Sequence, residues 1–131
     1  MKDLKNLFVP YTQALELKEL GFDEPCITYY YEDTHKIRTG LSIHIDNGWT
    51  YSGTKRLETT LASTFSQAFD FFREKYNLLG CTQYFTGGYY CYTINDMKDT
   101  KESNRLFTEF SSFKEAELAC LEKLIEIVKN K

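Results

Sequence analysis

The sequence predicts an α+β fold, with a single domain over residues 1–131 in which three helices pack against two antiparallel β-hairpins. Three segments have the apolar spacing of helices, and the segments between them are rich in aromatic and β-branched residues. The dipeptides Asn47-Gly48 and Gly87-Gly88 are typical of tight hairpin turns. The expected order is therefore helix, hairpin, helix, hairpin, helix. A chain of 131 residues with 42% hydrophobic residues is long enough to bury one core.

The first helix is expected from Pro10 to Leu20. Proline suits the first turn, where its missing N–H would have no intrahelical partner. Gly21 fits the left-handed position that ends a helix, and Phe22 is then placed to contact Leu17.

The first hairpin follows a strand expected over Cys26 to Tyr31. Leu41 to Asp46 alternates apolar and polar residues, and Trp49 to Ser52 is expected to return beside it after the Asn47-Gly48 turn. A two-residue turn fixes which side chains share a face. One face of this hairpin is therefore expected to present the side chains of Ser42, His44, Asp46, Trp49 and Tyr51.

This hairpin and its flanks also contain a local excess of positive charge. Residues 34–56 contain four basic residues and one acidic residue, whereas residues 1–33 contain three basic and seven acidic residues. Aromatic rings beside cations are typical of sites for nucleotides or other small anions. The alternative is that Trp49 packs under a loop and the cations are only solvated. The candidate ligand-binding residues are His44, Trp49, Tyr51, Lys55, Arg56, Lys36 and Arg38.

The second helix is expected from Thr64 to Tyr76, and the second hairpin pairs Cys81 to Thr86 with Tyr89 to Ile94. A two-residue Gly87-Gly88 turn would place Tyr84 and Tyr89 on one face, as candidate residues for binding a partner protein. The same register would send Cys81 and Cys91 to opposite faces.

One more strand, Leu106 to Phe110, is expected antiparallel to the last strand of this hairpin. The third helix is expected from Phe113 to Lys129, capped by Ser112. Its apolar face is wider than one contact requires, which makes a homodimer a possible use of it.

The sequence lacks the motifs that mark several classes of enzyme. No phosphate-binding glycine loop, nucleophile elbow or zinc motif is present, which disfavours enzymes of known motif class. His44 with Asp46 could form an acid–base pair, but two residues are too few for a metal site. We expect no cofactor. The cysteines at 26, 81, 91 and 120 are isolated, so we expect them to be buried apolar residues.

The charge and hydropathy pattern bears on location and on partners. The net charge of −3 disfavours nucleic acid as a partner. No apolar run is long enough to span a membrane and no signal peptide is evident, so we expect a soluble, cytoplasmic protein.

Three stretches, Tyr11 to Cys26, Phe65 to Tyr76 and Phe113 to Val128, together resemble a family of short uncharacterised open reading frames of phages and prophages of gut bacteria. The resemblance implies a small accessory protein in the cytoplasm of an infected host cell, and no functional residue. Two hypotheses follow: a non-enzymatic binding module for a host protein, or a protein that binds a nucleotide or other small anionic ligand. An enzyme that uses His44 and Asp46 is the third.

Overall fold

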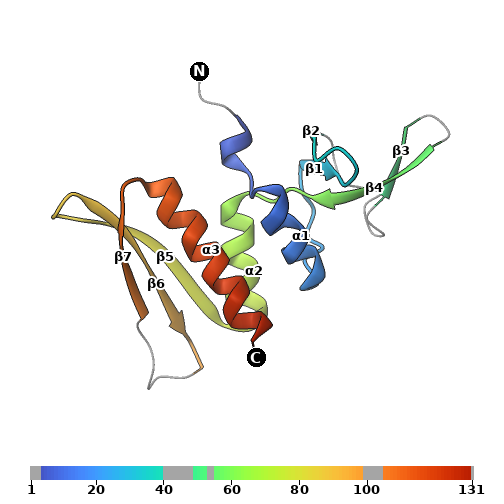
Figure 1. Ribbon diagram of the computed structural model, residues 1–131. Coiled ribbons are helices and arrows are strands. Elements are labelled where there is room, and N and C mark those ends of the chain that lie inside the picture. The colour runs from blue at the N-terminus through green and yellow to red at the C-terminus, as the bar shows by residue number, and fades with distance from the viewer. Residues whose placement is uncertain (1–3, 40–48, 53–54, 99–104, 131) are drawn as a thin grey trace. The chain divides into compact units, whose positions relative to one another are not determined.

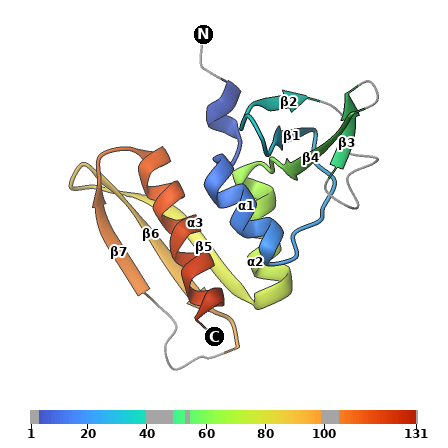
Figure 2. The same ribbon diagram turned by 45° about the vertical axis from the view of Figure 1, so that its right-hand side comes forward.

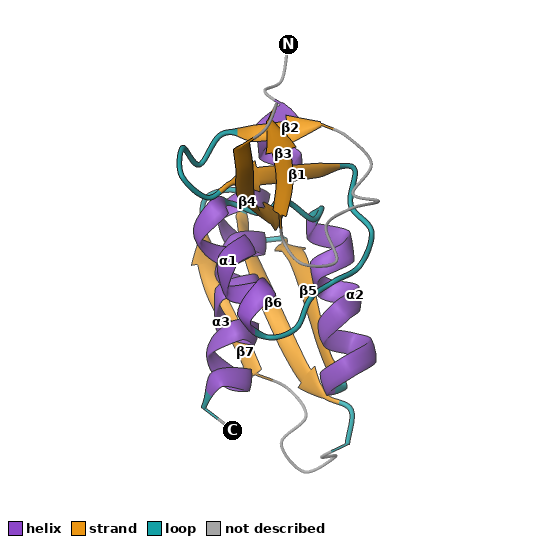
Figure 3. Cartoon of the chain, turned by 90° about the vertical axis from the view of Figure 1, so that its right-hand side faces the viewer, coloured by secondary structure: helices purple, strands orange, loops and turns teal. Residues whose placement is uncertain are grey.

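The computed structural model describes residues 4–39, 49–52, 55–98 and 105–130 of the chain (Figure 1). The chain divides into two compact units, Met1–Ser66 and Gln67–Lys131, and each is described by itself. Helices and antiparallel sheets are present, which confirms the α+β class (Figure 3).

The first unit contains a four-stranded antiparallel sheet in which the strands lie in the order β2 (Ile37–Thr39), β1 (Thr28–Tyr31), β4 (Lys55–Leu61) and β3 (Trp49–Ser52). After the strand Cys26 to Tyr31, the sequence predicts two more strands before the second helix. The strands β2 and β4 were not predicted. The expected strand Leu41 to Asp46 and the Asn47-Gly48 turn lie outside the described residues. In chain order, the elements are η1 (Leu4–Leu7), α1 (Tyr11–Glu19), β1 (Thr28–Tyr31), β2 (Ile37–Thr39), β3 (Trp49–Ser52) and β4 (Lys55–Leu61).

The end of α1 is as expected from the sequence. Gly21 has φ of 94°, and its N–H donates to the carbonyl of Lys18 at 3.0 Å. The Phe22 N–H donates to the carbonyl of Leu17 at 2.9 Å. This pair of bonds is the Schellman ending, which satisfies the last carbonyls of the helix.

The helix α2 (Phe65–Tyr76) begins in the first unit, and the division between the units falls within its first turn. The second unit continues with β5 (Leu78–Phe85), β6 (Tyr89–Asp96), β7 (Arg105–Phe110) and α3 (Phe113–Lys129). The three strands form an antiparallel sheet in the order β5-β6-β7, which confirms the expected position of the last strand. Helix α3 covers one face of this sheet (Figure 2).

The close approach of α3 to the sheet requires a glycine in β5. A Cβ added at Gly80 would lie 2.9 Å from Cys120 Sγ and 3.0 Å from Leu124 Cδ1. The start of α3 is capped as expected, because Ser112 Oγ accepts a hydrogen bond from the Glu115 N–H at 3.2 Å. The buried residues of this helix are Ala116, Cys120, Leu121, Leu124 and Ile125.

The register of the second hairpin corrects the expectation. Phe85 pairs with Tyr89, so the connection has three residues, 86–88, instead of two. Gly88 has φ of 90°, and its N–H donates to the Phe85 carbonyl at 3.0 Å. Glycine adopts this left-handed conformation without the steric cost of a side chain. The extra loop residue shifts the register by one position, which changes the side chains that share each face.

The cysteines of this hairpin illustrate the shift. Gln83 pairs with Cys91, so Cys81 and Cys91 lie on the same face of the sheet and not on opposite faces. The expectation that the cysteines are buried is confirmed for Cys26, Cys91 and Cys120, whereas Cys81 is partly exposed.

The ladder between β6 and β7 contains a β-bulge. Tyr90 pairs with Phe110 and Tyr92 pairs with Phe107, so two residues of β7 lie opposite Cys91. One of the two, Glu109, has φ of 86°, a conformation that is costly for a side chain other than glycine.

Candidate functional site

The residues predicted to bind a ligand are divided between described and undescribed parts of the first unit. His44 and Asp46 both lie outside the described residues. The hypothesis that they form an acid–base pair therefore stays a prediction. The backbone of β3 and β4 pairs Tyr51 with Arg56 and Trp49 with Glu58.

The side chains of Trp49, Tyr51, Lys55 and Arg56 lie outside the described residues. Lys36 and Arg38 are described, and both are exposed.

Lys36 and Arg38 belong to a face that sequence reasoning missed. Arg38 pairs with Tyr29 across β1 and β2, and the Tyr31 N–H donates to the carbonyl of Lys36 at 3.0 Å, which continues the ladder by one pair. Residues opposite each other in an antiparallel ladder, and residues two apart along a strand, share a face. We call this set, Tyr29, Tyr31, Lys36 and Arg38, the basic tyrosine face.

The two rings and the guanidinium of this face are in contact. The centroids of the Tyr29 and Tyr31 rings are 5.6 Å apart with an interplanar angle of 85°, the edge-to-face geometry that aromatic pairs prefer. Arg38 Cζ lies 5.9 Å from the centroid of Tyr31, within the range of a cation–π contact. Burial raises the pKa of Tyr29, as do a hydrogen bond and the charge interaction with Tyr31, while the nearby Arg38 lowers it.

The opposite face of β1 is directed toward the interior of the first unit. Thr28 and Tyr30 are both buried. The Tyr30 hydroxyl donates to the carbonyl of Val9 at 2.8 Å, and the Thr28 hydroxyl donates to the carbonyl of Ala62 at 2.6 Å. Burial raises the pKa of Tyr30. Because side chains alternate along a strand, these contacts leave Tyr29 and Tyr31 on the outer face.

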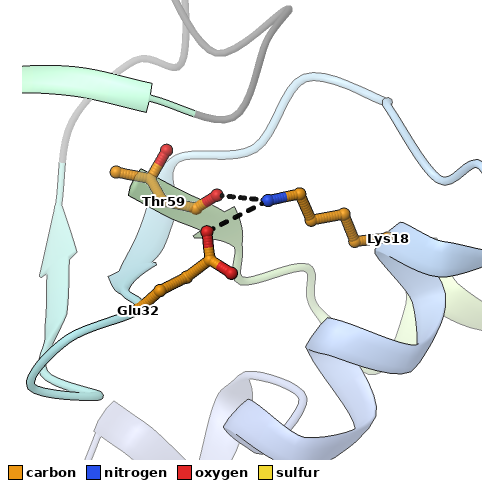
Figure 4. Close-up of polar contacts among 3 residues, drawn as sticks. All are labelled: Lys18, Glu32 and Thr59. Atoms are coloured by element: carbon orange, nitrogen blue, oxygen red, sulfur yellow. Dashed lines mark hydrogen bonds and ion pairs between the residues drawn. The ribbon is translucent and has the colours of Figure 1, made fainter. Parts of the chain in front are cut away.

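The acidic residue nearest in sequence to this face is already paired. Glu32 follows Tyr31, and its Oε2 accepts a hydrogen bond from Lys18 Nζ at 3.1 Å (Figure 4). The same ammonium donates to the backbone carbonyl of Thr59 at 3.1 Å. The charge of Glu32 is therefore balanced by α1 and does not need Lys36 or Arg38.

The turn between β1 and β2 is held by a ring stack. The His35 ring lies parallel to the Tyr11 ring of α1, with centroids 3.8 Å apart and planes inclined by 19°. His35 has φ of 57°, and its N–H donates to the Tyr31 carbonyl at 2.8 Å. Tyr11 also meets Tyr30 edge to face at 5.6 Å. The stack fixes the turn that brings Lys36 opposite Tyr31.

A second group of candidate residues lies in the second unit, at the end of the β5–β6 hairpin. Tyr84 is 61% exposed and Phe113, at the start of α3, is 43% exposed. The Tyr84 and Tyr90 rings are 5.2 Å apart, and the Tyr90 and Phe113 rings are 6.2 Å apart. The Phe85 and Tyr89 rings stack at 5.5 Å. We call these residues, Tyr84, Phe85, Tyr89, Tyr90 and Phe113, the hairpin aromatic cluster.

The predicted pair Tyr84 and Tyr89 does not share a face. Tyr84 pairs with Tyr90 and Phe85 pairs with Tyr89, so the two predicted tyrosines lie on opposite faces of the hairpin. The cause is the three-residue connection described above. Tyr84 is exposed and Tyr89 is half-buried, and both belong to the hairpin aromatic cluster.

Among residues 4–39, 49–52, 55–98 and 105–130, no three or more His, Cys, Asp and Glu side chains lie together as metal ligands would. Burial raises the pKa of the Cys120 thiol to about 12, which makes it a poor nucleophile. None of the described helices has both the length and the apolar character to cross a membrane.

Comparison with known proteins adds no relative. No protein-family model matches the chain, and neither a curated protein nor a solved structure matches it. The basic tyrosine face and the hairpin aromatic cluster are therefore the features of the chain from which a function can be inferred.

Proposed function

We propose that this chain is a non-enzymatic binding module that contacts a protein partner through the hairpin aromatic cluster. The observation behind this proposal is the exposure of Tyr84, at 61%, and of Phe113, at 43%, both of which contact the ring of Tyr90. Tyrosine is enriched among the residues that dominate the binding energy of protein interfaces. Aromatic rings supply a large contact area with few rotatable bonds, so little conformational entropy is lost on binding.

On one face of the hairpin, the rings of Tyr84, Tyr90 and Phe113 are already in contact before a partner binds, whereas Phe85 and Tyr89 stack on the opposite face. Tyr90 is half-buried and contacts both Tyr84 and Phe113, so it supports the two most exposed rings. Preorganised contact residues lower the entropic cost of association. This arrangement lowers the cost of binding a partner protein at Tyr84 and Phe113.

The resemblance of the three helical stretches to phage and prophage reading frames suggests the context of this interaction. In that context the partner is a host protein, and the interaction takes place in the cytoplasm of a gut bacterium. Neither catalysis nor a cofactor is needed for a protein that acts by occupying a host protein.

The test is capture of a partner from a lysate of a gut bacterium by the full chain, followed by affinity measurement with the purified partner. Tyr84→Ala and Phe113→Ala should each weaken binding about 30-fold, as expected for the loss of an interface hot spot. Ile27→Ser is the matched control, because Ile27 is 59% exposed and belongs to the first unit. The proposal fails when no protein is captured, or when the control weakens binding as much as Tyr84→Ala does.

A further inference from the structure

The first unit contains a second recognition surface that the proposed protein contact does not use. We propose that the basic tyrosine face binds a nucleotide, with the phosphate beside Lys36 and Arg38 and the base against the tyrosine rings. The residues of this ligand site belong to the first unit, whereas those of the hairpin aromatic cluster belong to the second.

The charge of the face fits one phosphate group. Lys36 and Arg38 are both exposed, and no carboxylate of the described residues forms an ion pair with either of them. Because Glu32 is paired with Lys18, Asp33 in the turn is the nearby acid whose charge would repel a bound anion. A phosphate monoester has a charge of about −1.5 to −2 at neutral pH. Two cations therefore balance one such group.

The chemistry of Arg38 suits both parts of a nucleotide. Its guanidinium can donate two parallel hydrogen bonds to phosphate oxygens, and a planar guanidinium also stacks on aromatic rings. Arg38 already lies over the ring of Tyr31. The Arg38 group is therefore held next to a flat apolar surface.

The tyrosines supply the contact for the base. Tyr29 and Tyr31 are partly exposed and perpendicular to each other, so a base can stack on one ring and meet the edge of the other. Stacking of a base on an aromatic side chain contributes about 1–3 kcal/mol. Inorganic phosphate cannot use this contact, and an uncharged nucleoside cannot use the cations.

A small ligand fits this face better than a nucleic acid chain. The chain has a net charge of −3, which repels a polyanion, whereas a single phosphate interacts mainly with its immediate neighbours. In addition, two cations are enough to contact one phosphate group but not the succession of phosphates along a nucleic acid strand.

The experiment is isothermal titration calorimetry of the full chain with AMP, GMP, inorganic phosphate, adenosine and guanosine as probes. We expect at least one of the two nucleotides to bind more tightly than phosphate or its own nucleoside, and its affinity to fall as salt is added. Arg38→Gln should weaken that nucleotide about tenfold or more, the loss expected for a charge-assisted hydrogen bond. Tyr29→Leu should weaken the nucleotide and leave phosphate unchanged.

Lys98→Gln is the matched control, because it removes an exposed cation from the second unit and should leave the affinity unchanged. Circular dichroism of each variant checks that it folds, and a second variant, Lys36→Gln, repeats the charge test if Arg38→Gln does not fold. The inference is overturned when neither nucleotide binds, when phosphate binds as tightly as the nucleotides, or when Arg38→Gln and Lys98→Gln have equal effects.

Discussion

Replacing Gly80 by alanine tests the packing of α3 on the second sheet. The added Cβ would lie 2.9 Å from Cys120 Sγ, 3.0 Å from Leu124 Cδ1 and 3.4 Å from Phe69 Cδ1. Non-bonded heavy atoms are most stable about 3.5–4.0 Å apart, so at least the first two contacts are too short. Cys120 and Leu124 are fully buried and cannot turn into solvent to relieve them.

The expected cost follows from two opposing contributions. Overpacking of a buried site costs about 1–3 kcal/mol. Alanine is more favourable than glycine inside a strand by about 0.5–1 kcal/mol. The two ranges combine to a net cost of about 0–2.5 kcal/mol, so Gly80→Ala should lower the free energy of unfolding by about 1 kcal/mol. Urea unfolding followed by circular dichroism measures this change through the transition midpoint.

A double-mutant cycle identifies the clash as the cause. Cys120→Ala removes the sulfur and should cost about 1 kcal/mol by itself through lost packing. In the double variant, the new methyl group occupies the space of the sulfur, so the combined loss should be smaller than the sum of the two single losses. Gly87→Ala is the control, because its Cβ would meet only the ring of Tyr89, which is half-exposed and can move. An unchanged midpoint for Gly80→Ala, or strictly additive losses, would refute this account of the packing.

The remaining predictions each concern a single group. Thr59→Val should raise the free energy of unfolding by about 1 kcal/mol, because the buried Thr59 hydroxyl has no hydrogen-bond partner in the described part of the chain. Thr28→Val should lower it by a similar amount, since that hydroxyl donates a hydrogen bond at 2.6 Å, and urea unfolding that gave both variants the same sign would contradict the pair. Ser112→Ala should lower the stability of α3 by about 1 kcal/mol through loss of its N-cap, as measured by thermal unfolding; an unchanged melting temperature would exclude this role. Burial raises the pKa of Cys120 from 9.0 to about 12, so the unfolded state releases a proton that the folded state keeps, and stability should fall as the pH rises above 9.0. Cys120→Ala should make this fall shallower in urea titrations across that range, and an equal slope in both proteins would show that the thiol is not responsible.

The parts of the fold that depend on neighbouring residues were predictable. The Schellman ending at Gly21 and the cap at Ser112 each depend on a few residues whose backbone chemistry is local. The apolar spacing of α3 also predicted its bounds, Phe113–Lys129. At the Gly21 ending and the Ser112 cap, the partners of each hydrogen bond lie within one or two helical turns of each other.

The strand registers were less predictable because they depend on connections between distant residues. One additional residue in the β5–β6 connection exchanged the faces of the hairpin, and the dipeptide Gly87-Gly88 alone did not distinguish a two-residue turn from a three-residue one. β4 escaped prediction because its sequence, KRLETTL, begins with charged residues and has no strict alternation. Its pairing with β1 and β3 comes from the tertiary structure.

The candidate sites also contain some features that the local sequence predicted and others that depend on strand pairing. The charge excess pointed to Lys36 and Arg38, but Tyr29 and Tyr31 were missed because the β1–β2 turn lacks the Asn-Gly pattern that marks a hairpin. A usable feature was present in the alternation around Tyr30, which predicts that its two tyrosine neighbours lie on the face opposite to it. Tyr84, a candidate residue for binding a partner, is exposed, and the tyrosine expected on its face lies on the other face.

The bulge at Glu109 has a consequence for how copies of this protein behave at high concentration. A regular outer strand presents a row of unpaired N–H and C=O groups on which another chain can add, which is a common first step in aggregation. A bulge bends and twists such a strand, so a second molecule cannot align with its full length. The left-handed backbone of Glu109, with φ of 86°, thus exchanges a local conformational cost for protection of β7 against intermolecular strand pairing.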